Sequence, residues 1–304
     1  MNEGIIRLIT TSDCTYNCFF CHREGIKDKR SIMMNVEDII FLYKIYNKYY
    51  GKDEIRISGG EPLMRKDIMD IAKGLYEVGC NTYLTTNGYL LKVKSDICKY
   101  LKKINISIHS LNNNKYREIT DTNVNVDNII NQIKKIRNEY PKLDIIIDTV
   151  LLKSINTDDN IDKLIKISKE LEIKIKFVEL FLNNKKYLYP LEELETKLKD
   201  KGFKKTMTYI RKIKYQRDNA QIYIAKCFCN INQDNKRFSD YCNKYNDLFI
   251  SPDGRVQLCR LCDKEVNILY EIKNRNEKEL IGKLDKAYQL LGKDCLVEGG
   301  KIWK

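Results

Sequence analysis

Three cysteines near the start of the chain have the residue type and the spacing of an iron–sulfur site. Cys14, Cys18 and Cys21 form a C-x3-C-x2-C pattern directly after a strand-like apolar run. Three thiolates on one short loop can hold three corners of a [4Fe–4S] cube, which leaves the fourth iron without a protein ligand. An iron with an open coordination position can bind a substrate directly. The first chemical prediction is therefore a cluster that takes part in catalysis.

The segments that must position this loop alternate between strand-like and helix-like patterns. Strand-like runs are predicted at 5–10, 54–58, 81–85, 105–109, 144–151 and 174–180. Apolar residues at helical spacing predict helices at 36–49, 67–78, 92–101, 126–138 and 161–171. Repeated βα units give parallel strands with helices outside, so we predict an α/β fold with a partial (β/α)6 TIM-like barrel. Its chemistry is expected at the carboxyl ends of the strands.

The pattern changes after about Tyr189. A short helix is predicted at 191–201, strand-like stretches at 207–217, 221–225, 247–250 and 255–259, and a last helix at 277–291. The segment Ser251-Pro-Asp-Gly254 predicts a hairpin turn with Gly254 in the left-handed conformation. We therefore expect a barrel over 1–188 and a smaller α+β region over 189–304 that packs on it.

Composition limits the class of protein and its location. The chain has 304 residues, of which 43% are hydrophobic, enough to bury a substantial core. It shows neither a basic start followed by an apolar stretch nor a run of about 18 apolar residues, so a signal peptide and a membrane partner are not expected. The predicted location is cytoplasmic. Eleven cysteines in such a chain suit metal ligation and free thiols better than disulfides.

The net charge of +13 favours an anionic partner, such as a phosphorylated small molecule or an acidic peptide. Lysine is spread over nearly every predicted helix, however, which equally fits a compositional bias of the genome. We do not expect nucleic acid as a partner.

Seven stretches carry recognisable motifs in order along the chain, at 7–14, 18–25, 55–63, 85–88, 106–111, 148–152 and 177–180. Together they resemble the radical S-adenosylmethionine (SAM) enzymes, and most of all the GTP 3′,8-cyclase family of molybdenum cofactor biosynthesis. The resemblance implies that the amino and carboxylate groups of SAM chelate the open iron. It also implies that an electron from the cluster cleaves SAM to a 5′-deoxyadenosyl radical. A low-potential electron donor such as flavodoxin or ferredoxin would then be a partner.

The same resemblance assigns the SAM-binding positions. They are Phe20, Gly59, Gly60, Glu61, Ser107 and Phe181. Adjacent glycines suit this role because they let backbone carbonyls approach a ligand closely. His109 stands where the family commonly has Asp, and it is either a site residue or a buried, hydrogen-bonded histidine. Cys80 and Cys98 are expected to be buried, inert thiols.

The substrate positions are matched in part. Arg7, Arg56 and Thr85 stand at positions that bind GTP in the family, and two guanidinium groups suit a phosphate or carboxylate. Ile146 stands where the family has a lysine, and Lys244 where it has the first of two arginines. A nucleotide and a peptide therefore both stay open as substrates.

A second group of cysteines follows in the C-terminal region. Cys242 and Cys259 fit the spacing of auxiliary-cluster domains called SPASM and Twitch, and three more cysteines could complete the ligand set. These are Cys227, Cys229 and Cys262. We predict a second [4Fe–4S] cluster, with a zinc site or unligated thiols as the alternatives.

Three functions are compatible with these motifs. The leading hypothesis is a radical SAM enzyme that abstracts hydrogen from a bound nucleotide and drives cyclisation or rearrangement, like the GTP 3′,8-cyclases. The second is a peptide-modifying radical SAM enzyme of the Twitch or SPASM type. The third is a non-catalytic iron–sulfur protein, which has no need of a SAM pocket.

Overall fold

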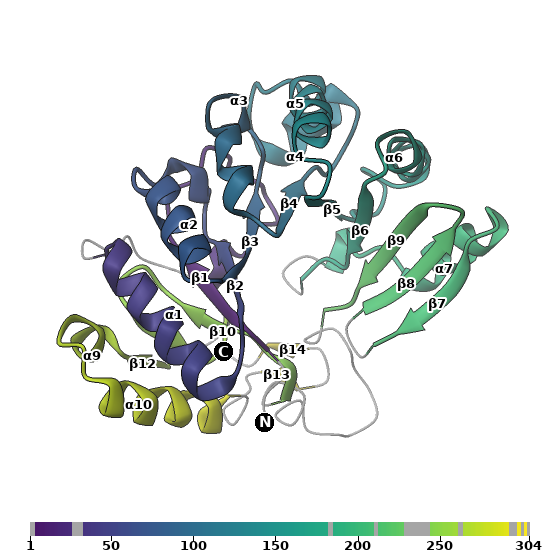
Figure 1. The fold of residues 1–304 in the computed structure, drawn as a ribbon. Helices are drawn as coiled ribbons and strands as arrows, with labels where there is room; N and C mark the ends of the chain where they lie inside the picture. Colours follow the sequence, from purple (N-terminus) through teal and green to yellow (C-terminus); the bar gives the residue numbers. More distant parts are fainter. Residues whose placement is uncertain are drawn as a thin grey trace.

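The computed structural model describes residues 4–25, 33–181, 185–209, 212–227, 244–260, 264–291, 297–298 and 301–302. Twelve strands of this part form one curved sheet, and the helices lie along its outer side (Figure 1). A two-stranded sheet of β13 (Val297–Glu298) and β14 (Lys301–Ile302) is separate from it. Within the described part of the chain, no helix combines the length and the apolar character that a membrane crossing requires.

Six parallel strands form the barrel, which confirms the predicted α/β fold. They are β1 (Ile6–Ile9), β2 (Glu54–Ser58), β3 (Asn81–Thr86), β4 (Lys103–Ser107), β5 (Asp144–Val150) and β6 (Lys174–Val178). Each pairs in parallel with the next along the chain. Strand β4 ends at Ser107 rather than at His109, because the carbonyl of His109 accepts hydrogen bonds from Asn156 and Asn160 instead.

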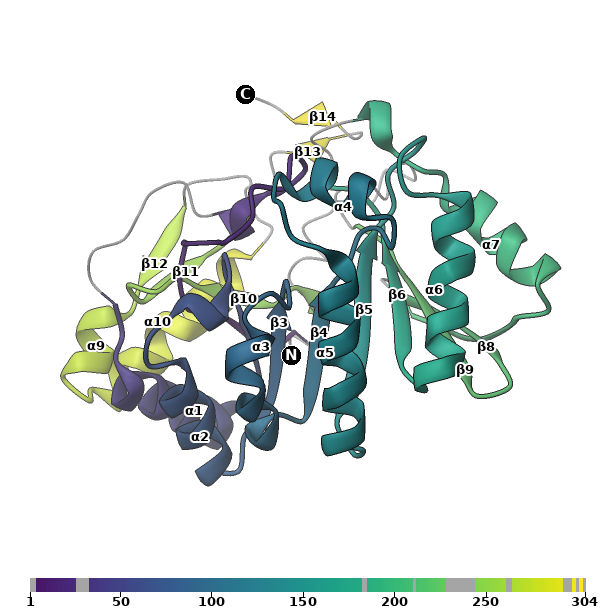
Figure 2. The same cartoon turned by 90° about the horizontal axis from the view of Figure 1, so that it is seen from above.

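The helices between these strands cover the outer face of the sheet. They are α1 (Val36–Tyr50), α2 (Ile68–Glu77), α3 (Leu91–Lys94), α4 (Asn113–Thr120), α5 (Val126–Glu139) and α6 (Asp158–Leu171). Asn35 caps α1 in a reciprocal capping box with Asp38. The helix predicted at 92–101 is short, since the chain continues from α3 into a 3-10 helix over Ser95–Tyr100. Helix α6 runs beside β6 in both views (Figure 2).

Alternation along each strand separates the core from the site. In β2, Ile55 and Ile57 are fully buried against the helices, whereas Arg56 between them is partly exposed on the other face. The outer face of the sheet is therefore the hydrophobic core. We call the concave face, which carries residues such as Arg7 and Arg56, the inner face.

The C-terminal strands extend the barrel sheet on both edges. On one edge lie β7 (Lys204–Thr208), β8 (Lys212–Arg217) and β9 (Ala220–Ala225), of which β9 is parallel to β6. On the other lie β10 (Leu248–Ile250), β11 (Arg255–Gln257) and β12 (Glu265–Asn267), of which β10 is parallel to β1. The stretch predicted as one strand at 207–217 is thus a hairpin of two strands. The predicted turn before β11 is confirmed, with Gly254 at φ 71°.

Three helices accompany these strands in the part of the C-terminal region that the structure describes. They are α7 (Leu191–Asp200), α9 (Leu269–Lys273) and α10 (Glu277–Leu290). Helix α10 contacts α1 of the barrel, and Tyr46 of α1 lies 3.0 Å from Tyr288 of α10 between their hydroxyl oxygens. The C-terminal helices therefore pack directly on the barrel.

Candidate active site

The three cysteines of the C-x3-C-x2-C pattern lie on the loop that follows β1. Their thiols are unbridged, and backbone N–H groups point at two of the sulfurs. Tyr16 donates to Cys14 Sγ at 3.4 Å, and Arg23 donates to Cys21 Sγ at 3.3 Å. Burial raises the pKa of all three thiols, that of Cys18 to about 12. Thiolates in this loop therefore require a nearby positive charge, such as that of bound iron.

This donor set fits an iron–sulfur cluster better than a single metal ion. Among the described residues, no three His, Cys, Asp or Glu side chains converge on one ion position. A cluster does not need such convergence, because each thiolate binds a different iron. Cys14, Cys18 and Cys21 would hold three irons, and N–H donors to the sulfurs are the hydrogen bonds that tune such a cluster.

The Gly59-Gly60-Glu61 segment packs directly against the backbone of residues 11–13, just before Cys14. Gly60 N donates to Thr11 O and Glu61 N donates to Asp13 O, both at 2.8 Å. A Cβ at Gly60 would lie 2.2 Å from Asp13 O, and one at Gly59 would lie 2.5 Å from Thr11 O. The glycines are therefore required by this contact between two backbones, whatever ligand they also approach.

The carboxylate of Glu61 is fully buried and joins this segment to the loop after β3. It accepts hydrogen bonds from Leu63 N at 3.0 Å, Asn87 N at 2.7 Å and Thr86 Oγ1 at 2.7 Å. Burial raises its pKa even though these hydrogen bonds oppose the shift. Asn87 in turn donates to Thr15 Oγ1 at 2.8 Å, and its amide lies 3.9 Å from Cys14 Sγ. Glu61 thus positions the cluster loop through Asn87.

Aromatic residues assigned to SAM lie around the same loop. Phe20 stands edge-on to His109 with ring centroids 4.8 Å apart, and Phe181 stands edge-on to His22 at 5.5 Å. His109 is buried, its Nδ1 accepts a hydrogen bond from Val150 N at 3.3 Å, and burial lowers its pKa to about 4. Of the two alternatives for His109, the structure supports the buried, neutral histidine.

The arginines assigned to substrate lie side by side on the inner face, but both are already paired. Arg7 and Arg56 share the carboxylate of Asp247 at 3.1 and 3.0 Å, and Arg7 also pairs with Glu24 at 3.3 Å. Glu24 accepts a hydrogen bond from Ser58 at 2.9 Å. Burial alone would raise the pKa of Glu24, but Arg260 and Arg7 hold it well below its usual range.

Two other assigned positions, Thr85 and Ser107, face the same side of the sheet. Both are partly exposed near the carboxyl ends of β3 and β4, and Thr85 is paired with Asn105 in the sheet. Asn105 donates to both carboxylate oxygens of Asp148, at 2.9 and 3.0 Å. The cysteine thiols, the two hydroxyl groups and the charged side chains therefore lie toward the same end of the inner face.

The candidates for an auxiliary cluster are described only in part. Cys229, Cys242 and Cys262 lie outside the described residues. Cys227 follows β9, which runs parallel to the barrel strands, and Cys259 follows β11, which runs antiparallel to β10. By their strand directions these two cysteines follow opposite ends of the sheet, Cys227 the carboxyl ends and Cys259 the amino ends of the barrel strands. Cys80 and Cys98 are buried, as predicted.

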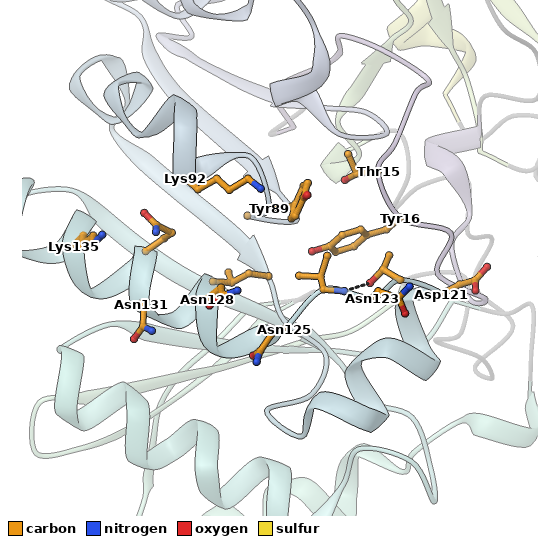
Figure 3. Close-up of a pocket in the computed structure, with 15 residues that line it drawn as sticks. Thr15, Tyr16, Tyr89, Lys92, Asp121, Asn123, Asn125, Asn128, Asn131 and Lys135 are labelled. Carbon is orange, nitrogen blue, oxygen red and sulfur yellow. Dashed lines mark hydrogen bonds between the residues drawn. The ribbon is translucent and has the colours of Figure 1, made fainter.

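A cavity of about 1130 Å³ lies on the outer side of the cluster loop. Thr15 and Tyr16 of that loop form one end of it, and Lys92 and Lys135 also line it. Figure 3 shows the rings of Tyr16 and Tyr89 beside each other at this end, with centroids 6.5 Å apart. The cavity brings solvent close to Cys14 from outside the barrel.

Four residues that the sequence patterns did not single out are central to the site. They are Glu24, Asn87, Asp247 and Arg260. Glu24 and Asn87 stood within motifs that were recognised, so their places in those motifs were the available signal. Asp247 and Arg260 flank the C-terminal strands, and no spacing in the sequence connects them with the first 25 residues.

Comparison with known proteins decides the family. The model of the radical SAM superfamily matches residues 8–167, just over half of the chain. The chain belongs to the radical SAM superfamily. Membership implies SAM and a [4Fe–4S] cluster as cofactors, in agreement with the thiols of the loop after β1.

Relatives of similar length extend the comparison beyond the matched segment. The probable GTP 3′,8-cyclase of Pyrobaculum aerophilum is 29% identical over 292 residues, which cover 91% of this chain and 90% of that protein. That of Methanocaldococcus jannaschii is 31% identical over 270 residues, 85% of each chain. Among solved structures, Streptococcus suis SuiB bound to S-adenosylmethionine has a TM-score of 0.67 at 18% identity and covers 93% of this chain and 68% of its own. This last likeness shows the fold.

Proposed function

We propose that this radical SAM enzyme acts on a nucleotide, abstracting hydrogen and driving a cyclisation or rearrangement of the GTP 3′,8-cyclase type. The observation that carries the proposal is similarity to probable GTP 3′,8-cyclases over nearly the whole chain, C-terminal strands included. The position of Arg7 and Arg56 on the inner face, near the cluster loop, is consistent with it.

The residues of the site would divide the work. A bound cluster and SAM supply the electron and the 5′-deoxyadenosyl radical. Cys14, Cys18 and Cys21 hold the cluster, and the backbone around Gly59 and Gly60 fixes the loop that carries it. The inner face orients the substrate and limits access of water, so that the radical meets one hydrogen atom.

An electron donor is part of this proposal. Because SAM and substrate would occupy the inner side of the cluster, an electron carrier such as flavodoxin or ferredoxin would approach from the outer side. The cavity beside Thr15 and Tyr16 lies there, and its lining carries two lysines, Lys92 and Lys135, against one carboxylate, Asp121, a net positive charge that suits an acidic carrier.

The test is production of 5′-deoxyadenosine by the anaerobically reconstituted, reduced protein with SAM. It compares no substrate, GTP, other nucleotides and peptides. We expect GTP or another nucleotide to stimulate production and to yield a new cyclised or rearranged product. GTP stimulation would show that Ile146 and Lys244 are tolerated at their positions.

Other outcomes contradict the proposal in distinct ways. Stimulation by a peptide alone would favour the peptide-modifying alternative. Slow cleavage that no nucleotide changes would keep the radical SAM assignment and remove the nucleotide. No SAM binding and no cleavage at all would favour a non-catalytic iron–sulfur protein.

A further inference from the structure

Lysines from three separate strands converge on the half of the inner face opposite Arg7. Lys103 of β4, Lys176 of β6 and Lys212 of β8 occupy inward positions of their strands and are partly exposed. The ammonium group of Lys212 lies 3.9 Å from the centre of the Tyr223 ring. Strands β4 and β8 are not neighbours in the sheet, yet the charges of Lys103 and Lys176 both act on the ammonium group of Lys212, which places the three groups within electrostatic range of one another.

The carboxylates near these lysines, Asp148 and Asp144, already have other hydrogen-bond or ion-pair partners. Lys176 Nζ lies 2.7 Å from Asp148 Oδ2, and both oxygens of Asp148 also accept hydrogen bonds from Asn105. Lys103 Nζ is 4.0 Å from Asp144, whose other oxygen lies 2.7 Å from Lys174. Within the described part of the chain, Lys212 has no ion pair.

The charges around Lys212 are therefore unbalanced. The ammonium group of Lys212 lies over the ring of Tyr223 on β9, and the charged groups that act on it are Arg56 of β2, Lys103 of β4, Asp148 of β5 and Lys176 of β6. Burial, followed by the charges of Lys176 and Lys103, lowers the pKa of Lys212 to about 8. Burial also lowers the pKa of Lys103 and Lys176. Such a group of cations is costly unless an anion joins it.

We propose that Lys103, Lys176 and Lys212 form an anion subsite that binds the phosphate chain of a nucleoside phosphate. The proposal rests on the nucleotide substrate proposed above and adds the place where its phosphates lie. It also gives the C-terminal hairpin a role, since Lys212 comes from β8 and the other two lysines from the barrel. A phosphate chain fits because it presents several oxygens to cations that arrive from different strands.

The subsite has a characteristic pH dependence. A phosphate bound at Lys212 favours the protonated amine, so binding raises the pKa of that lysine above 8. The contribution of Lys212 to the affinity therefore falls as the pH rises through about 8, because the free protein must then take up a proton in order to bind. Replacing this lysine by arginine keeps the charge and removes the part of the pH dependence that comes from this position.

The experiment is calorimetric titration of the reconstituted holoprotein with inorganic tripolyphosphate, which needs no turnover. The variants are Lys212→Met, Lys212→Arg and the control Lys204→Met, an exposed lysine of the same hairpin. We expect Lys212→Met to weaken binding about tenfold at pH 7, since it removes one charge-assisted hydrogen bond. Lys212→Arg should bind about as well as the wild type at pH 7 and lose less affinity than the wild type between pH 7 and pH 9. SAM binding, measured in parallel, reports whether each variant is folded.

Three outcomes would overturn the subsite: no binding of tripolyphosphate by the wild type, equal weakening in Lys212→Met and Lys204→Met, or the same pH dependence in Lys212→Arg and the wild type. A carboxylate-rich peptide that binds while tripolyphosphate does not would also overturn it. Failure of the proposed reaction is distinguishable. If no nucleotide stimulates SAM cleavage but tripolyphosphate binds through Lys212, the subsite stands and the reaction does not.

Discussion

Two regions of the barrel are held together differently. At the cluster end, by which we mean the loop after β1 and the Gly59-Gly60-Glu61 segment, the contacts are between backbones, whereas charged side chains line the inner face. Gly60 and Glu61 donate to the carbonyls of Thr11 and Asp13, and the carboxylate of Glu61 is fully hydrogen-bonded. On the inner face, Lys212 has no ion pair within the described residues and its pKa is lowered to about 8. The carboxylate of Glu61 therefore has its partners within the protein, whereas the ammonium group of Lys212 has no carboxylate partner among the described residues.

The two regions therefore answer different questions, the cluster end about the cofactors and the inner face about the substrate. The cluster end is built to hold a loop in place, and its contacts follow from the requirement for a cluster and SAM. The inner face carries cations from several strands, and the anion subsite proposed above would make this face the part of the molecule that depends on the substrate. Its arginine side is neutralised by Asp247 and Glu24, which leaves the lysine side as the better place for an anion.

The largest expected effect is the loss of a cluster ligand. We expect Cys18→Ala to reduce 5′-deoxyadenosine formation to background both with and without substrate, since one iron loses its thiolate. The matched control is Cys98→Ala, another buried thiol, which should retain SAM cleavage. Iron content and 5′-deoxyadenosine are the measurements. Retained cleavage in Cys18→Ala would contradict the mechanism.

Backbone packing at the cluster end makes the second prediction. Gly60→Ala would place a Cβ 2.2 Å from Asp13 O, so we expect the free energy of unfolding to fall by about 2–4 kcal/mol and SAM affinity to fall with it. The control Gly282→Ala lies in α10, where nothing is within 4 Å of the new Cβ, and should gain up to about 1 kcal/mol. Thermal unfolding under anaerobic conditions compares the two. Equal changes in the unfolding temperature of the two variants would show that the contact between Gly60 and Asp13 tolerates an added methyl group.

The third prediction concerns the arginine side of the inner face. Asp247→Asn removes the charge that Arg7 and Arg56 share, which should cost about 2–3 kcal/mol of stability and tighten tripolyphosphate binding about threefold. SAM cleavage without substrate should change less than tripolyphosphate binding, because Asp247 reaches the cluster loop only indirectly, through Arg7 and Glu24. Asp162→Asn is the control, as that carboxylate is half exposed beside Lys201 and contributes little. Calorimetry and the unfolding temperature provide the readouts, and weaker or unchanged tripolyphosphate binding in Asp247→Asn would contradict the prediction.

Sequence patterns predicted the cluster end better than the inner face. The strands β1 to β6 and the loop cysteines follow from local signals, namely apolar runs and a short motif. Helix α4 was missed because it buries few apolar side chains, among them Tyr116 and Ile119, and so has no periodic pattern to detect.

The inner face depends on contacts that are distant in sequence. Asp247 reaches Arg7 across 240 positions, because β10 adds to β1 in parallel, and Lys212 lies within electrostatic range of Lys103 although β4 and β8 are not neighbours in the sheet. No local pattern encodes such pairs, although the alternation of strands does predict which residues face inward. The auxiliary cluster stays a prediction, since three of its five candidate cysteines lie outside the described residues.

The smallest expected effect concerns the cavity on the outer side of the cluster loop. Lys92→Glu combined with Lys135→Glu should slow SAM cleavage driven by reduced flavodoxin several-fold at low ionic strength, because an acidic carrier would lose electrostatic steering toward the cavity. Cleavage driven by dithionite should not change, since this small reductant needs no docking surface. The control Lys166→Glu on α6 reverses an exposed charge far along the barrel and should leave both rates as they are. If the double variant slows the dithionite-driven rate equally, the two lysines support the cluster loop itself, and the carrier docks elsewhere.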